Sequence, residues 1–200
     1  TKTLSAGVPI VVGSTGWYKE MPTVKAEVER TNGSLFWASN FSIGVNIFVA
    51  MQKYVAKIMN NYPNYDVSLE ETHHIHKLDS PSGTAITIAE AITDNLDRKD
   101  HWKETACLWL NEDMSVDVAK NAEVATTFAS HDDNELEVTA FRRGEVPGIH
   151  TVVYDSEVDT ITMTHSAKSR RGFALGAVIA AEFMSDGKKG VYTMTDLMKF

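Results

Sequence analysis

The chain has 200 residues, a formal net charge of −8 at pH 7 and a single cysteine. This length allows one or two domains with a sizeable core, and the negative charge argues against nucleic-acid binding, which needs a basic face. No apolar run approaches the ~20 residues of a membrane span, and the first residues lack a secretory signal pattern. One cysteine excludes an internal disulfide and suits a reducing compartment. We therefore expect a cytoplasmic protein that binds neither nucleic acid nor membrane, with Cys107 in an apolar core run.

The N-terminal part predicts a small piece of parallel α/β structure. Residues 10–12 are continuously apolar, as in a strand buried on both faces. The elements that follow are a helix over 19–30, a strand over 35–38 and an amphipathic helix over 43–60. The apolar positions of the last helix include Val45, Phe48, Tyr54 and Ile58.

The remainder predicts a sheet with a few helices. Its elements are strands over 67–71, 123–129, 135–142, 150–154 and 160–166, and helices over 85–96 and 173–183. Several of these strands alternate apolar and polar residues, which is typical of half-buried antiparallel strands. Glycines follow the last helix and indicate turns.

Residues 71–84 are the most informative segment. Three of the seven histidines fall within four positions, and Lys77 follows at once. The segment lies between a predicted strand and a predicted helix, which Ser82 or Thr84 can cap. The N–H groups of such a helix start attract a carboxylate or phosphate, and a histidine can donate or accept a proton near neutral pH. The pattern predicts an anion site beside a proton donor.

Two other interpretations of the same residues remain. The histidines could mark a solvated strand end with an ordinary helix cap. They could also bind zinc, but His73 and His74 point to opposite faces of a strand, no pair has the i, i+4 spacing of a helical zinc motif, and Lys77 would repel a cation. We therefore expect no metal.

The segment also resembles a family signature. Its pattern, Glu-x-His-His-x-His-Lys-x-Asp-x-Pro-Ser-Gly-Thr, is similar to that of the 4-hydroxy-tetrahydrodipicolinate reductases, also called dihydrodipicolinate reductases, and every fixed position is present. Further matches occur in order over residues 13–17, 40–46, 144–151 and 164–170.

The resemblance implies a reaction and a set of site residues. The reaction is the NADH- or NADPH-dependent reduction of 4-hydroxy-tetrahydrodipicolinate, a cyclic dicarboxylate, to tetrahydrodipicolinate with loss of water, in lysine and diaminopimelate biosynthesis. The implied catalytic residues are the proton donors His73 and Lys77. The implied substrate contacts are His74, Gly83 and Thr84. The implied cofactor contacts are Gly13, Ser14, Thr15, Ala38, Ser39, Asn40 and Phe41.

The resemblance implies an α/β fold with a characteristic division. Residues 1–41 would be a truncated Rossmann-like dinucleotide domain, because no Gly-x-Gly-x-x-Gly motif is present in the chain. Residues 42–170 would be an α+β domain with a mixed, largely antiparallel open sheet for substrate binding and tetramerisation, and residues 171–200 would return as a helix to the dinucleotide domain. The family is usually a homotetramer.

The activity of this chain and the roles of several residues have more than one interpretation. The 200 residues alone are expected to bind dinucleotide poorly and to lack activity. Two alternatives are a non-catalytic dicarboxylate-binding fragment and a histidine metal-dependent hydrolase. The roles of Arg142, Arg143, His150 and Arg170 are undecided, with ordinary exposed arginines as likely as carboxylate contacts.

Overall fold

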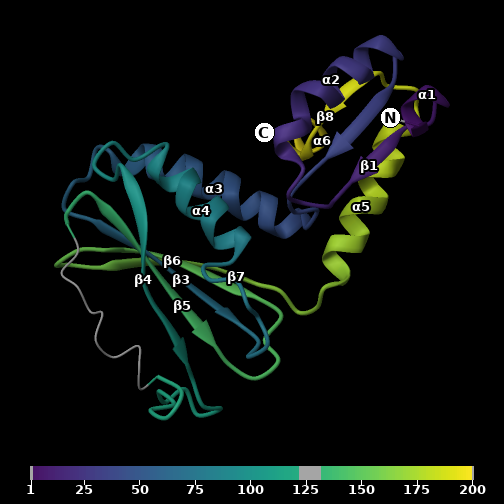
Figure 1. The fold of residues 1–200 in the computed structure, drawn as a ribbon. Coiled ribbons are helices and arrows are strands. Elements are labelled where there is room, and N and C mark those ends of the chain that lie inside the picture. The colour runs from purple at the N-terminus through teal and green to yellow at the C-terminus, as the bar shows by residue number, and fades with distance from the viewer. Residues whose placement is uncertain (1, 122–131, 200) are drawn as a thin grey trace. The chain divides into compact units, whose positions relative to one another are not determined.

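The computed structural model describes residues 2–121 and 132–199, so the strand predicted over 123–129 lies outside the described residues. The chain divides into two compact units (Figure 1). Unit 1 comprises Thr1–Asn46 and Arg170–Phe200, and unit 2 comprises Ile47–Ser169. Within the described ranges, no helix is long and apolar enough to cross a membrane.

Unit 1 is a three-stranded parallel sheet with helices on both faces. Its strands are β1 (Ile10–Val12), β2 (Ser34–Trp37) and β8 (Gly190–Tyr192), in the order β1-β2-β8. Its helices are α1 (Lys2–Ser5), the 3-10 turn η1 (Tyr18–Glu20), α2 (Met21–Arg30), α5 (Arg171–Met184) and α6 (Met194–Met198). Leu35 packs with α1 and α2, whereas Phe36, on the opposite face, packs with α5. Burial of both faces is typical of parallel sheets.

Most elements predicted for unit 1 are confirmed, with two differences. The helix expected from residue 19 begins with η1 and becomes α-helical at Met21, where Pro22 occupies the first turn, a position in which proline is well tolerated. The short elements β8 and α6 have no predicted counterpart, because three and five residues are too few for a readable period.

Unit 2 contains a mixed sheet, as predicted, with five strands in the described residues, but the sheet is not largely antiparallel, because two of its four strand pairings are parallel. Its strands are β3 (Asp66–His73), β4 (His101–Trp109), β5 (Glu135–Arg142), β6 (Ile149–Asp155) and β7 (Thr160–Ser166), in the order β4-β5-β3-β6-β7. The central strand β3 is parallel to β5 and antiparallel to β6. β4 joins β5 in parallel, and β7 joins β6 antiparallel.

Two helices cover one face of this sheet. They are α3 (Ile43–Met59), which begins in unit 1, and α4 (Gly83–Thr93), and the ribbon shows them side by side over the strands (Figure 1). Val67 and Leu69 of β3 point toward the helices and join a core with Ile88 of α4. Because side chains alternate along a strand, Glu71 and His73 point to the same covered face. The core therefore leads directly into the signature segment.

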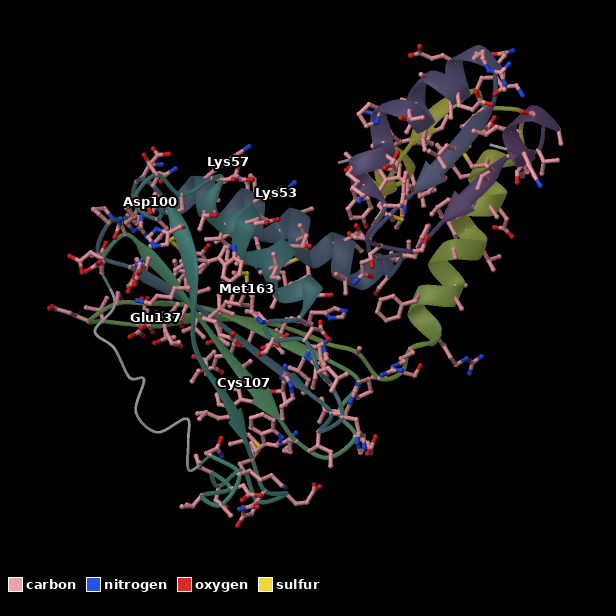
Figure 2. The ribbon with its side chains drawn as sticks, viewed as in Figure 1. Lys53, Lys57, Asp100, Cys107, Glu137 and Met163 are labelled. Carbon is pink, nitrogen blue, oxygen red and sulfur yellow. The ribbon has the colours of Figure 1, made fainter. Side chains whose placement is uncertain are left out.

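The edge strand β4 is a strand that the sequence patterns do not predict. It begins with polar and charged residues, which are common on edge strands because they discourage edge-to-edge pairing. Cys107 lies on this strand and is half-buried rather than in the core (Figure 2).

The buried face of α3 also differs from the prediction. Val45 and Phe48 are buried as expected, but Tyr54 is 68% exposed and Ile58 is 39% exposed. The fully buried Gln52 takes a place in the packed face, where its side-chain amide donates to the Met163 sulfur of β7. Because a polar residue belongs to the buried face of α3, the spacing of apolar residues does not identify this face correctly.

Candidate active site

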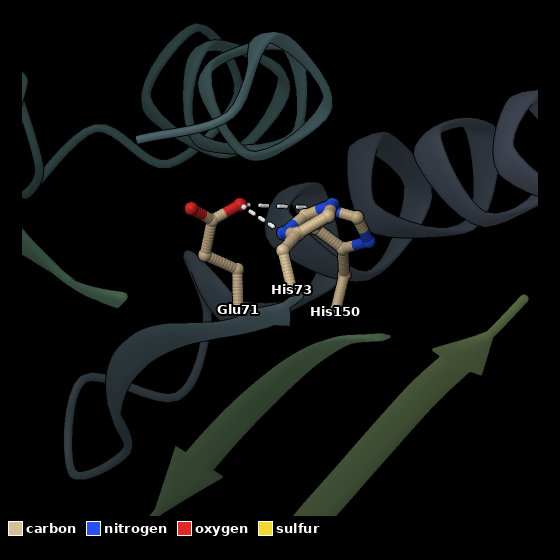
Figure 3. A group of neighbouring side chains, drawn as sticks. All are labelled: Glu71, His73 and His150. Atoms are coloured by element: carbon tan, nitrogen blue, oxygen red, sulfur yellow. Dashed lines mark ion pairs between the residues drawn. The ribbon is translucent and has the colours of Figure 1, made fainter. Parts of the chain in front are cut away.

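Four side chains of unit 2 form what we call the buried cluster: Glu71, His73, Arg142 and His150. The register of the sheet brings them together, because Glu71 pairs with His150 of β6, and His73 pairs with Arg142 of β5. All four are buried, with at most 8% of each residue exposed. Figure 3 shows both histidine rings directed toward the Glu71 carboxylate.

The carboxylate of Glu71 is the centre of this cluster. Its Oε1 atom accepts from the backbone N–H of Ser82 at 3.0 Å and lies 3.5 Å from the Arg142 guanidinium. Its Oε2 atom lies 3.3 Å from Nδ1 of His73. Burial alone would raise the pKa of Glu71, but the contacts with His73 and Ser82 outweigh burial and lower this pKa to about 2. Glu71 is therefore an anion at neutral pH.

His150 has the opposite electrostatic character. Burial, reinforced by the neighbouring His73, lowers the pKa of His150 to about 3. Its Nε2 atom lies 3.2 Å from the hydroxyl of Ser82 and 3.7 Å from Glu71. The ring packs edge-on against His73 with centroids 5.3 Å apart. At neutral pH it is an uncharged neighbour of His73.

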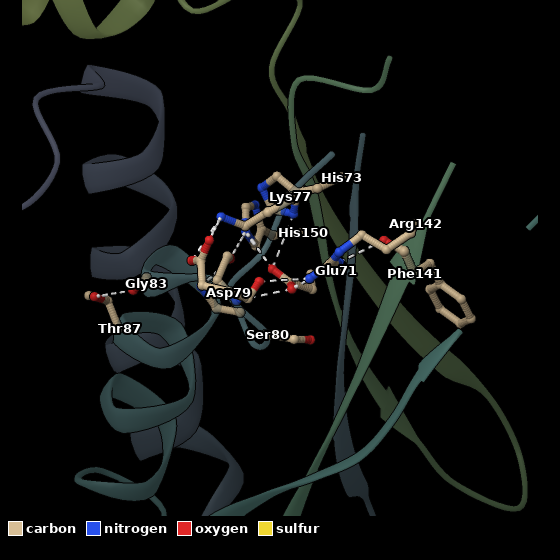
Figure 4. Close-up of polar contacts among 12 residues, drawn as sticks. Glu71, His73, Lys77, Asp79, Ser80, Gly83, Thr87, Phe141, Arg142 and His150 are labelled. Atoms are coloured by element: carbon tan, nitrogen blue, oxygen red, sulfur yellow. Dashed lines mark hydrogen bonds and ion pairs between the residues drawn. The ribbon is translucent and has the colours of Figure 1, made fainter. Parts of the chain in front are cut away.

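The signature loop (residues 74–80) follows β3 and is more open to solvent. The Lys77 ammonium donates to both carboxylate oxygens of Asp79 at 2.8 Å, and this contact lowers the pKa of Asp79 (Figure 4). His76 lies on the surface 2.9 Å from Glu145. The rings of His74 and His76 are 6.0 Å apart. The loop thus holds a cation and two further histidines beside the buried cluster.

Helix α4 starts where the signature loop ends. Ser82 is the N-cap, and its hydroxyl accepts from the backbone N–H of Ala85 at 3.1 Å. Gly83 and Thr84 are the first two helical residues, so their N–H groups belong to the positive end of the helix dipole. The predicted capping role of Ser82 is confirmed, and the helix begins two residues earlier than expected. This arrangement can attract a carboxylate.

The residues expected to contact the cofactor lie together in unit 1. Gly13, Ser14 and Thr15 follow β1, and residues 38–41 follow the adjacent parallel strand β2. A Cβ at Gly13 would lie 3.1 Å from the Phe41 ring, so the two segments touch. Ligands of parallel α/β sheets bind at the carboxyl ends of strands, which is where both segments lie.

Several site residues differ from what the sequence indicates. Arg142 is not an exposed arginine. It is 1% exposed, and it donates to the backbone carbonyl of Asp79 at 2.8 Å. The signature pattern contains Glu71 as a fixed position without assigning it a role, and it leaves the role of His150 undecided. Pairing of β3 with strands about seventy residues away brings Arg142 and His150 to Glu71 and His73, and a sequence pattern does not specify that register.

The buried cluster also has the composition of a metal site. One ligand atom from each of Glu71, His73 and His150 lies within 4.8 Å of the others. The spacing argument against a metal considers only neighbouring histidines and overlooks His150. The Arg142 guanidinium beside Glu71 and the nearby Lys77 still oppose a cation.

Comparison with known proteins agrees with the signature. Residues 44–198 match the family described as "Dihydrodipicolinate reductase, C-terminus". The 4-hydroxy-tetrahydrodipicolinate reductase of Christiangramia forsetii is 39% identical over 96% of this chain and 70% of its own length. That of Methanopyrus kandleri is 32% identical over 98% of this chain and 65% of its own length.

A solved structure shows the same fold. The dipicolinate-bound dihydrodipicolinate reductase from Paenisporosarcina sp. TG-14 superposes with a TM-score of 0.65 at 21% identity, covering 96% of this chain and 64% of that protein. The chain thus spans about two thirds of the length of these proteins. On the match over residues 44–198 and the relatives' identity, the chain belongs to the dihydrodipicolinate reductase family.

Proposed function

We propose that the protein containing this chain reduces 4-hydroxy-tetrahydrodipicolinate to tetrahydrodipicolinate with loss of water, in lysine and diaminopimelate biosynthesis. The observation that carries the proposal is the placement of His73 and Lys77, from the end of β3 and the signature loop, next to the start of α4 (Figure 4). A proton donor, a cation and a helix N-terminus together suit an anionic substrate that must be protonated during reduction.

The substrate would be held by its carboxylates. The N–H groups of Gly83 and Thr84 at the start of α4 suit one carboxylate, and the Lys77 ammonium and the His74 ring add charge and hydrogen bonding. The Paenisporosarcina protein is described as bound to dipicolinate, which is a planar cyclic dicarboxylate. This likeness supports the same substrate class here.

Protons are needed at two points of such a reaction. Departure of the 4-hydroxyl group as water requires a proton on its oxygen, and hydride addition to a conjugated imine leaves an electron pair that must be protonated. We assign these transfers to His73 and Lys77. NADH or NADPH supplies the hydride when bound, and Gly13, Ser14 and Thr15 with residues 38–41 would contact it. The close approach of Gly13 to Phe41 suits a loop that passes near a ligand.

The two units suggest a division of labour. We assign dinucleotide binding to unit 1, including the returning helix α5, whose Gly176 lies so close to Phe41 that a Cβ would be 1.8 Å from the Phe41 carbonyl oxygen. We assign substrate binding to unit 2, and homotetramer formation to its open sheet. The assembled protein would act in the cytoplasm.

The test replaces the two proton donors in the full-length protein. His73→Gln and Lys77→Met should each lower kcat, by roughly 10²- to 10⁴-fold for a general acid. The matched control is His76→Gln, because His76 is an exposed histidine of the same loop. Oxidation of NADH or NADPH with the substrate is the measurement, and dipicolinate titration reports binding. Unchanged rates in both variants would refute the assignment.

The metal-dependent hydrolase remains a second candidate because of the three donor atoms around Glu71. It predicts that zinc or iron is retained through purification at one ion per chain, and that chelation abolishes activity. Reductase activity that survives chelation would eliminate it.

A further inference from the structure

We propose that Glu71 is a positioning residue that fixes the ring orientation and the tautomer of His73. Its carboxylate would hold the proton of His73 on Nδ1, so that Nε2 is the atom that exchanges protons with the substrate. This inference rests on the proposed role of His73 as a proton donor. It assigns a task to the most deeply buried carboxylate of the signature, which the reaction scheme above does not use.

The first support is geometric. Glu71 and His73 are two residues apart on β3, so they share the covered face of the sheet. Oε2 of Glu71 lies 3.3 Å from Nδ1 of His73. The side chains are 0% and 10% exposed, which leaves little water to compete for Nδ1. In a neutral histidine, the group that accepts from one ring nitrogen decides the protonation of the other.

The second support is that the carboxylate itself is fixed. Its other oxygen, Oε1, accepts from the Ser82 backbone N–H at 3.0 Å and lies 3.5 Å from the Arg142 guanidinium. One oxygen is therefore anchored to the scaffold while the other faces the ring. A purely structural counterion for Arg142 would not require Oε2 to face a histidine (Figure 3).

The third support is the close packing around the His73 ring, including Nε2. Gly148 has a φ of +154°, and a Cβ at this position would lie 3.0 Å from Nε2 of His73. A larger residue would press on the ring at the nitrogen we assign to proton exchange. Together with His150, packed edge-on at 5.3 Å, Glu71 and Gly148 enclose the ring on several sides. A ring that is held in this way keeps one orientation.

The central test is Glu71→Gln in the full-length enzyme. Glutamine is nearly isosteric and its carbonyl can still accept from Ser82, but it removes the charge that favours a proton on Nδ1. We expect kcat to fall roughly ten- to a hundredfold, with KM changed less than about twofold, because His73 remains present but is misoriented. Glu71→Asp, which keeps the charge, should recover part of the rate.

The matched control is Glu70→Gln. Glu70 is the neighbouring residue on β3 and points to the opposite, exposed side of the strand. The chemical change is identical, so a loss of rate confined to Glu71→Gln reflects the buried position. Circular dichroism and thermal melting identify a variant that fails to fold.

A readout that does not depend on activity is the tautomer of His73. Nitrogen-15 NMR of histidine rings at about pH 8.5, above the usual histidine range, should show Nδ1 of His73 protonated in the wild type. In Glu71→Gln this resonance should move toward the unprotonated position. An unchanged tautomer would overturn the proposal, even if kcat falls.

A double-variant cycle separates this inference from the proposed function. If Glu71 acts through His73, adding Glu71→Gln to the His73→Gln variant should lower kcat no further. An equal cost in both backgrounds would overturn the positioning role. If His73→Gln alone leaves the rate unchanged, the proton-donor assignment is wrong, whereas the tautomer measurement still decides whether Glu71 controls the ring.

Discussion

The buried cluster and the signature loop each contain one cation paired with one carboxylate, but in different surroundings. In the cluster, Arg142 and Glu71 are 3.5 Å apart and their side chains are 1% and 0% exposed. In the loop, Lys77 and Asp79 are 2.8 Å apart and are 17% and 63% exposed. Loss of one partner should cost less at the shorter contact, because water solvates the remaining exposed group, whereas the remaining partner of the buried pair is left as an uncompensated charge. We therefore expect the larger loss of stability at the buried pair, although its contact distance is longer.

The difference suits different tasks. A buried charge cannot exchange its partner without a large desolvation cost, so the cluster is a fixed framework around His73. The Lys77 ammonium can leave Asp79 for another carboxylate at little cost, which is what binding of a dicarboxylate would require. Orientation of the His73 ring and binding of the substrate carboxylate are thus assigned to different residues of β3 and its loop.

The largest expected effect breaks the buried pair. Arg142→Met leaves Glu71 as a buried charge without its guanidinium partner, and should lower the free energy of unfolding by about 3–5 kcal/mol. Lys77→Met removes the loop cation and should cost about 1 kcal/mol or less. Urea unfolding of the two variants measures both values. Equal losses would contradict the ranking by burial.

The signature segment is the part that sequence reasoning can predict. Its spacing predicts the end of β3 and the start of α4 to within two residues, and the Ser82 cap, because these features depend on residues close together in the chain. The cluster depends instead on β3 pairing in parallel with β5 and antiparallel with β6. Arg142 therefore looks like a loop arginine until the register places it beside Glu71.

The fold shows the same limit. Long elements with a clear period, such as α3 and α5, are confirmed with small shifts at their ends. The edge strand β4 and the three-residue β8 lack such a period, and neighbours distant in sequence stabilise them. The expected split at residues 41 and 170 remains a prediction about function.

An intermediate effect concerns pH. The pKa of His150 is lowered to about 3, mainly by burial, whereas an unfolded histidine titrates near 6.5. Between these values the unfolded state binds a proton that the folded state does not, so stability falls as the pH falls. The slope is about 1.4 kcal/mol per pH unit, or about 2 kcal/mol between pH 6.5 and 5. Below about pH 4.5, protonation of unfolded Glu71 adds to the loss, since its folded pKa is about 2.

The check is urea unfolding of His150→Asn at several pH values. The variant should lose the His150 part of the slope above pH 4.5, and should keep a smaller slope from His165, whose pKa burial also lowers. His76→Asn, which removes an exposed histidine of the signature loop, is the matched control. A wild-type stability that is flat from pH 6.5 to 5 would mean that His150 is protonated in the folded state.

The smallest effect sharpens the description of the signature loop. Asp79 competes with a bound carboxylate for the Lys77 ammonium, to which it is bonded at 2.8 Å. Asp79→Asn should therefore strengthen dipicolinate binding, at most about fivefold, because an exposed pair is worth up to about 1 kcal/mol. Glu145→Gln is the matched control, since it removes one negative charge from an exposed pair with His76 nearby. Isothermal titration at two salt concentrations measures both variants. An equal gain in the control would attribute the effect to general charge, whereas a gain confined to Asp79→Asn indicates that the Lys77 ammonium is the group that meets the carboxylate.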